Sequence, residues 1–196
     1  IVVYDLRNSQ SLEVNFFDVG QGDAIFIETP KRHQILIDGG PTTVILEKLG
    51  KEIAFWDRTI DLIILTHPEK DHLVGLIEVL KKYKVENILW TGVVRDTSEY
   101  KEWERFVRED SNPPATLPLK RAPKPKILLA KSGQKIKWSK AVFDCFEILY
   151  PFEGLEGKEF KDSNNTSIVA KLVFGENSFL FTGDAYKSVE RELLEK

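Results

Sequence analysis

The stretch LTHPEKDHLVGL, residues 65–76, holds the side chains with the clearest capacity for chemistry. It contains two of the three histidines of the chain, His67 and His72, and between them the carboxylates Glu69 and Asp71. Imidazole and carboxylate groups together suit Zn²⁺ or Mn²⁺. Spaced so closely, they would form two ligand pairs, one for each ion of a two-metal site with ions roughly 3.5–4 Å apart. The stretch predicts a metal or catalytic site, although carboxylates also favour helix N-termini for electrostatic reasons alone.

A further carboxylate, Asp184, follows Gly183 in the stretch FLFTGDA, where another hydrophobic run ends. A glycine at this point lets the backbone turn tightly and approach its neighbours. Asp184 would then be able to bridge two metals. The alternative is that Asp184 only caps the last helix of the chain.

Rigid elements must hold these groups, and the hydrophobic pattern indicates them. Residues 59–66 form a continuous apolar run typical of a strand buried on both faces, and residues 72–83 have apolar positions at helical spacing. The candidate metal ligands would lie in the loop between them. We expect further helices at 41–52 (ending at Gly50), 97–109 and 185–196, and strands at 12–19, 23–28, 33–40, 85–92, 134–138, 143–151, 166–175 and 177–184. This order favours an α+β sandwich of two sheets with helices outside.

The composition is that of an ordinary globular domain. The 196 residues are 42% hydrophobic and 30% charged, which suffices for one core, and we expect a single domain over residues 1–196. The net charge of −3 shows no overall basic excess. A single cysteine, Cys145, excludes an internal disulfide, and no run approaches the roughly 18 apolar residues of a membrane span. The third histidine, His33, lies in a turn and is expected to be solvated.

Five motifs together resemble the metallo-β-lactamase fold and, within it, the ComEC competence proteins. In the order of that family they are FFDVGQGDAIFIE, ILIDGG, LTHPEKDH, NNTSIVAKLVFG and FLFTGDA, and the resemblance covers residues 12–190. It implies an αββα four-layer sandwich and a two-metal hydrolase. It also implies the soluble domain of an inner-membrane DNA channel, on the outer face of that membrane, which degrades the DNA strand that is not imported.

The resemblance assigns roles to the residues of the first motif. His67 and Glu69 match the ligands of one ion, Asp71 and His72 match the ligands of the second, and Asp184 matches the residue that bridges both. Either Asp71 or Asp184 would hold the attacking water and manage its proton, so both are candidate catalytic residues.

Other polar residues match family positions around the site. Asp38 matches an aspartate at the floor of the site, and Asp18 and Asp23 match positions near its mouth, although both of these would serve equally well as turn caps. Asn164 and Asn165 lie in the region where many members of the fold have another histidine.

The departures from the family pattern affect the expected metal. Glu69 stands where most members of the fold have histidine and ComEC proteins have aspartate, and this hard oxygen ligand favours Mn²⁺ slightly over Zn²⁺. We expect two divalent ions and no small-molecule cofactor. The extra methylene of Glu69 would alternatively misplace an ion and leave a degenerate module. The final strands and the last family ligand, a histidine, are expected beyond Lys196.

A basic stretch is the candidate contact for nucleic acid. Residues 118–143 contain no acid and eight cations: Lys120, Arg121, Lys124, Lys126, Lys131, Lys135, Lys137 and Lys140. Such a stripe suits a phosphate backbone, and Trp138 within it would stack on a base. An equally good interpretation is a solvated strand face whose lysines protect a sheet edge.

The leading functional hypothesis is a metal-dependent nuclease or phosphodiesterase whose partners are DNA and the rest of a membrane channel. The fold alone does not fix the reaction. A free-standing hydrolase of small esters or phosphodiesters, and a catalytically degenerate structural or DNA-guiding module, therefore remain alternatives.

Overall fold

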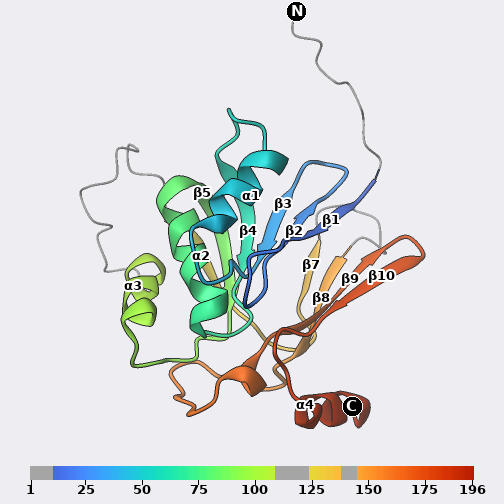
Figure 1. Cartoon of the computed structure of the whole chain (residues 1–196). Coiled ribbons are helices and arrows are strands. Elements are labelled where there is room, and N and C mark those ends of the chain that lie inside the picture. The colour runs from blue at the N-terminus through green and yellow to red at the C-terminus, as the bar shows by residue number, and fades with distance from the viewer. Residues whose placement is uncertain (1–10, 109–123, 138–144) are drawn as a thin grey trace, which may run out of the picture.

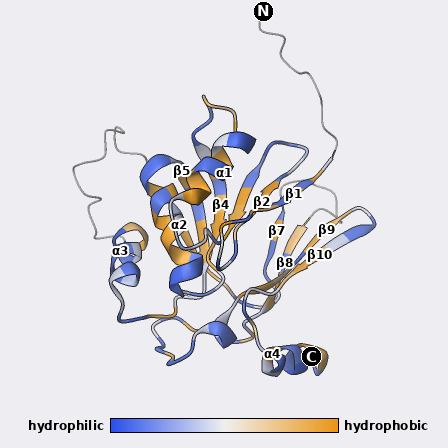
Figure 2. Ribbon diagram, viewed as in Figure 1, coloured by the Kyte–Doolittle hydropathy of each residue, from blue (hydrophilic) through white to orange (hydrophobic). Residues whose placement is uncertain are grey.

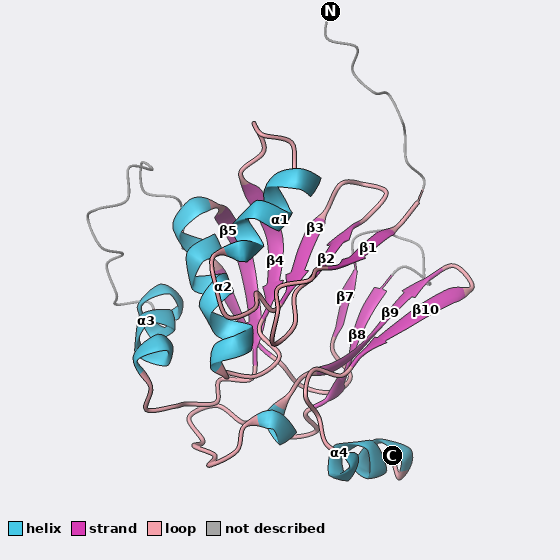
Figure 3. Cartoon of the chain, viewed as in Figure 1, coloured by secondary structure: helices cyan, strands magenta, loops and turns pink. Residues whose placement is uncertain are grey.

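The computed structural model describes residues 11–108, 124–137 and 145–196. The elements in chain order, shown in Figure 1 and Figure 3, are β1 (Glu13–Phe16), β2 (Ile25–Glu28), β3 (Gln34–Ile37), α1 (Val44–Glu52), β4 (Thr59–Ile64), α2 (Lys70–Lys82), β5 (Lys84–Trp90), α3 (Ser98–Val107), β6 (Lys126–Leu129), β7 (Lys135–Lys137), β8 (Cys145–Tyr150), a 3-10 turn (Asn164–Thr166), β9 (Val169–Phe174), β10 (Asn177–Phe181) and α4 (Lys187–Leu194). No helix in this part of the chain is long and apolar enough to cross a membrane.

The strands form two sheets. One has six strands in the order β1-β2-β3-β4-β5-β6, antiparallel from β1 to β3 and parallel from β3 to β6. The other has four antiparallel strands in the order β10-β9-β8-β7. Because β3, β4 and β5 are parallel, the loops that follow them emerge at the same edge of the first sheet.

Two hydrophobic cores hold the layers together, one on each face of the first sheet. Hydrophobic residues are frequent along the strands of this sheet and on α2 (Figure 2). In β4, Ile63 joins the core beneath α1, α2 and α3, whereas Leu62 and Ile64 join the core between the two sheets. This arrangement explains the apolar run at residues 62–65, since successive side chains of a strand covered on both faces meet one core or the other. The helices α1 to α3 cover the first sheet, and α4 lies beyond the end of β10 (Figure 1).

Two glycines allow the turn after β3 to lie directly on helix α2. A side-chain carbon on Gly75 would lie 1.8 Å from the carbonyl oxygen of Gly39, and one on Gly39 would lie 2.5 Å from the backbone nitrogen of Leu76. Because neither position has a side chain, the two backbones approach closely enough to form hydrogen bonds. The Gly39 N–H donates to the His72 carbonyl and the Gly75 N–H donates to the Gly40 carbonyl, each at 2.9 Å. This backbone contact brings the end of β3 against the start of α2.

The predicted α+β sandwich is confirmed, and most of the expected elements are present in it. Three details differ. Helix α1 runs through Gly50 to Glu52, because Gly50 has a helical backbone and open space around it. Helix α2 begins two residues earlier than expected, at Lys70. Strand β6 was not expected, because prolines dominate the sequence before it, yet it pairs in parallel with β5.

Candidate metal centre

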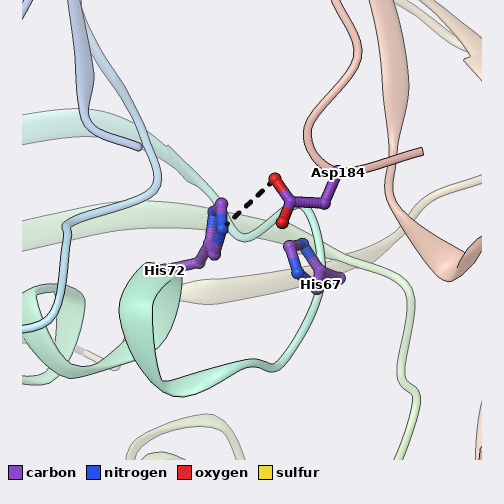
Figure 4. A group of neighbouring side chains, drawn as sticks. All are labelled: His67, His72 and Asp184. Atoms are coloured by element: carbon purple, nitrogen blue, oxygen red, sulfur yellow. Dashed lines mark ion pairs between the residues drawn. The ribbon is translucent and has the colours of Figure 1, made fainter. Parts of the chain in front are cut away.

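The loop after β4 and the first turn of α2 place two imidazoles side by side. His67 and His72 are both buried, and their ring centroids lie 4.2 Å apart. Asp184 reaches them from the loop after β10, in the other sheet, with its Oδ1 3.5 Å from His72 Nε2 (Figure 4). Each of the three offers a ligand atom within 4.8 Å of the other two, so they form a group able to hold a metal ion.

The two sheets meet at this point because small residues and backbone contacts allow it. The Ile168 N–H, just before β9, donates to the Thr66 carbonyl at 3.0 Å. A side-chain carbon on Gly183, which has φ +49°, would lie 3.0 Å from Thr66 and 3.1 Å from Ser167. The glycine next to Asp184 thus lets the loop after β10 lie close to the end of β4, which carries Asp184 to the histidines.

The chemistry of the donor set fits a divalent cation. The Nε2 atoms of His67 and His72 are buried and have no hydrogen-bond partner among the described residues. A buried polar atom without a partner costs stability, so such atoms are rare unless another group satisfies them. A divalent ion between these nitrogens and Asp184 would satisfy both nitrogens.

Each histidine is oriented through its other nitrogen. Asp38 Oδ2 lies 2.8 Å from His72 Nδ1, and Thr66 Oγ1 lies 3.0 Å from His67 Nδ1. The Thr66 hydroxyl donates its single proton to Asp38 Oδ2 at 2.6 Å, so it accepts from His67 Nδ1–H. The lone pair of His67 is therefore on Nε2, which faces the cluster. This is the usual way in which ligand histidines are held.

Asp38 organises these contacts from a fully buried position. Its backbone has φ +55°, in the left-handed region, and its carboxylate also accepts the Thr66 N–H at 2.8 Å. Sequence reasoning placed Asp38 at the floor of the site but missed Thr66. The signal that could have identified Thr66 was its position between a buried strand and the first histidine of the motif.

The two histidines differ in protonation before a cation binds. Burial and the charge of His72 lower the pKa of His67. Burial also lowers the pKa of His72, but its hydrogen bond to Asp38 and the negative charge of that residue outweigh burial and raise the pKa to about 9. A cation would therefore displace a proton from His72 on binding.

Asp23 forms a second candidate group with Asp38 and His72. Burial, followed by the charge of Asp38, raises the pKa of Asp23. A cavity of about 160 Å³ opens beside it. Its polar side chains are Asp23, Asp38, Thr66 and Thr182, and its apolar lining includes the exposed side chains of Phe16 and Leu180.

The two remaining members of the first motif lie outside both groups. Glu69 Oε1 accepts from Ser163 Oγ at 2.5 Å and lies 2.9 Å from Arg95 Nη2. Asp71 Oδ2 accepts from Gln21 Nε2 at 3.1 Å. Neither Glu69 nor Asp71 completes a group of three ligand atoms with the described residues. Their roles as metal ligands stay predictions.

The structure also places the predicted residues around the site. Asp18 is exposed and accepts the Gly20 N–H at 3.2 Å, as a turn cap does. Asn164 Nδ2 donates to the Tyr186 hydroxyl, and Asn165 Oδ1 accepts the Tyr186 N–H, each at 3.1 Å. The two asparagines therefore hold the chain just after Asp184 and do not enter the cluster.

The alternative role of Asp184 as a helix cap is excluded, because Tyr186 is the N-cap residue of α4. His33 has 41% of its side chain exposed, as expected for a turn residue, and its Nδ1 also lies 3.2 Å from Asp61 Oδ1.

The basic stretch is only partly described. Lys120, Arg121, Trp138 and Lys140 lie outside the described residues. Lys126 is in β6 of the first sheet, whereas Lys135 and Lys137 are in β7 of the second. All three are exposed, and Lys135 Nζ lies 3.1 Å from Glu147 Oε1. The nucleic-acid track stays a prediction.

The family follows from comparison with known proteins. Residues 17–196 match the family model described as the metallo-beta-lactamase superfamily, and the chain belongs to that superfamily. Its members are typically metal-dependent hydrolases. The chain is 26% identical over 212 residues to ComE operon protein 3 of Bacillus subtilis (strain 168), which confirms the resemblance to the ComEC proteins. That match covers 99% of this chain but 24% of the relative, so the chain spans about a quarter of its length.

Solved structures show the same fold at low identity. A metallo-β-lactamase of Cronobacter sakazakii is 16% identical, with a TM-score of 0.52 over 86% of this chain and 58% of that one. The metallo-β-lactamase SMB-1, bound to 2-mercaptoethanesulfonate, is 14% identical, with a TM-score of 0.50 over 93% of this chain and 68% of that one. These similarities establish the metallo-β-lactamase fold and leave the substrate open.

Proposed function

We propose that this chain is a metal-dependent phosphodiesterase domain that cleaves DNA. The observation that carries the proposal is the pair of buried Nε2 atoms of His67 and His72, which face Asp184 and have no hydrogen-bond partner among the described residues. Imidazole and carboxylate together suit Zn²⁺ or Mn²⁺, and the carboxylates around the cluster favour Mn²⁺. A second ion, which the motif assigns to Asp71 and His72, is part of the activity to be tested.

The residues of the chain have distinct roles in this proposal. When bound, the ion would make hydroxide available at neutral pH and offset the charge that grows on the phosphate. Asp38 and Thr66 keep the two imidazoles oriented, which is the preorganisation that catalysis requires. Asp184, with 41% of its side chain exposed, holds the attacking water from the solvent side. Asp23 lies at the cavity, where its carboxyl group would deliver a proton to the leaving oxygen.

The choice of DNA rests on similarity and not on the site. The match to ComE operon protein 3 covers almost the whole chain, and the motifs are those of the ComEC competence family. By this argument the domain acts in DNA uptake, beside a membrane channel formed by other parts of the protein and on the outer face of the inner membrane. The exposed Lys126 and Lys137 are candidate contacts for the phosphate backbone.

The test is cleavage of linear DNA with Mn²⁺ or Zn²⁺, using this chain and the same domain extended at its C-terminus. We expect cleavage that chelator abolishes and that His67→Ala and Asp184→Asn lower by at least about 100-fold, since both remove a metal ligand. His33→Ala, which changes a histidine away from the cluster, is the matched control. Folded, metal-loaded protein without cleavage of DNA would contradict the choice of substrate. Equal activity of His67→Ala and the parent protein would contradict the site.

A further inference from the structure

Glu69 is joined to a cation and a buried hydroxyl. Its Oε1 lies 2.9 Å from Arg95 Nη2 and accepts from Ser163 Oγ at 2.5 Å. Ser163 is fully buried, and Arg95 has 18% of its side chain exposed. A charge-assisted pair in such a sheltered place is stronger than an exposed ion pair, because water competes less for both groups.

Arg95 also holds two segments that are distant in the sequence. Its Nη1 donates to the carbonyl of Phe160 at 2.7 Å and to that of Lys161 at 3.1 Å. The neighbouring Val94 forms an isolated parallel bridge with Glu159, and its N–H donates to the Lys158 carbonyl at 3.0 Å. The segment after β5 thus lies along residues 157–161, and Arg95 connects both to the loop that carries the histidines.

For Glu69 to turn its Oε1 toward an ion, both partners of that atom would have to be given up together. Arg95 would remain largely buried with its Nη2 unpaired, and the buried Ser163 hydroxyl would lose its acceptor. Breaking one side of a sheltered ion pair is strongly unfavourable, because the remaining charge stays desolvated. His67, His72 and Asp184 already form a complete group of three ligand atoms without Glu69.

We infer that Glu69 is a positioning residue and not a metal ligand. It pairs with Arg95 and Ser163, keeps residues 157–163 packed beside the metal centre, and leaves metal binding to His67, His72 and Asp184. The inference rests on the metal binding of the proposed function but is independent of DNA cleavage. It also accounts for a glutamate where the family has histidine or aspartate, since the longer side chain reaches a different partner.

The experiment measures metal binding directly, by calorimetric titration with Mn²⁺ and Zn²⁺ and by native mass spectrometry. The proteins are the parent chain, Glu69→Gln, Arg95→Gln and His67→Ala. We expect Glu69→Gln to keep the stoichiometry of the parent and its affinity within about threefold, and His67→Ala to lose at least about 100-fold. Loss of an ion in Glu69→Gln, or a loss of affinity above tenfold, would overturn the inference.

The positioning role has its own measurement, which is amide hydrogen exchange of residues 157–163. We expect faster exchange in Glu69→Gln and in Arg95→Gln, with other core amides unchanged. Lys101→Ala is the matched control, because it removes an exposed ion pair with Asp96 close to Arg95 in the sequence. Unchanged exchange in both variants would also overturn the inference. If the parent chain and His67→Ala bind metal equally weakly, the proposed metal centre itself is wrong.

Discussion

Asp38 Oδ2 and His72 Nδ1, 34 residues apart in the sequence, lie 2.8 Å apart in the buried floor of the candidate metal centre. The contact joins the end of β3 to the first turn of α2 and fixes which nitrogen of His72 faces the cluster. It also sets the charge of the imidazole before a cation binds. The behaviour of the centre should therefore depend on a residue that binds no ion in the proposed site.

Substitution of Asp38 by asparagine should weaken metal binding. Asparagine can accept hydrogen bonds from Thr66 but does not supply the negative charge that orients His72 and makes it a better ligand. We expect a loss of about 10- to 100-fold in Mn²⁺ affinity, measured by calorimetric titration. Asp61→Asn is the control, because Asp61 forms the other histidine–aspartate pair, with His33, away from the cluster. Equal losses in both variants would show a general loss of stability instead of an effect at His72.

The stability of the metal-free protein should depend on the proton of His72. The pKa of His72 is raised from 6.5 to about 9 in the folded protein. A raised pKa means that its stabilising contribution is fully present below about pH 6.5 and is lost as the pH rises through about 9. The pKa of His67 is lowered, so its contribution to the unfolding free energy falls as the pH drops below the ordinary histidine pKa, which is the opposite trend. The pH dependence of the parent protein must therefore be compared with that of a variant.

Urea unfolding of the metal-free protein, in the presence of chelator and at pH 6 and pH 9.5, measures this change in unfolding free energy. Between these values the parent protein should lose about 3 kcal/mol more unfolding free energy than Asp38→Asn, in which the main cause of the raised pKa is absent. Parallel pH profiles of the two proteins would show that His72 is not charged in the metal-free fold.

The contact between Gly39 and Gly75 should be intolerant of any side chain. Gly75→Ala would place a methyl group 1.8 Å from the Gly39 carbonyl oxygen, so α2 would have to move. We expect a loss of about 1–3 kcal/mol in unfolding free energy. Gly50→Ala is the control, because Gly50 is helical with open space around it and should gain about 0.4–1 kcal/mol. Denaturant unfolding of both variants tests the pair, and a neutral Gly75→Ala would contradict the backbone contact.

The described part of the basic stretch can be tested through salt dependence. Changing Lys126, Lys135 and Lys137 to glutamine should flatten the slope of DNA affinity against salt concentration by about 0.9 for each phosphate that is no longer neutralised. Lys135 should contribute least, since it also pairs with Glu147. The control changes three other exposed lysines, Lys31, Lys51 and Lys82, to glutamine. Equal slopes for the two triple variants would remove the argument for a track at this stretch.

The sequence was sufficient for most of the elements and for placing the candidate site at the end of a buried strand, because both depend on local patterns. An apolar run covered on both faces, followed by His67, indicated that a buried strand ends at a metal site. The pairing of Glu69 with Ser163 was not predictable in this way, because 94 residues separate them and their proximity depends on how the segment after β5 lies along residues 157–161. The Thr66 hydroxyl was missed for a related reason, since its role appears only when Asp38 arrives from β3.

The metal centre draws on both sheets, and this sets an order of events when the chain is made. During synthesis, His67 and His72 leave the ribosome together with strands of the first sheet, before β8, β9 and β10 have been made. Asp184 arrives only with the loop after β10, and its place beside the histidines requires the second sheet to be packed on the first. An unfinished chain without β10 therefore lacks this carboxylate, so the candidate centre forms only after both sheets have been synthesised and packed together.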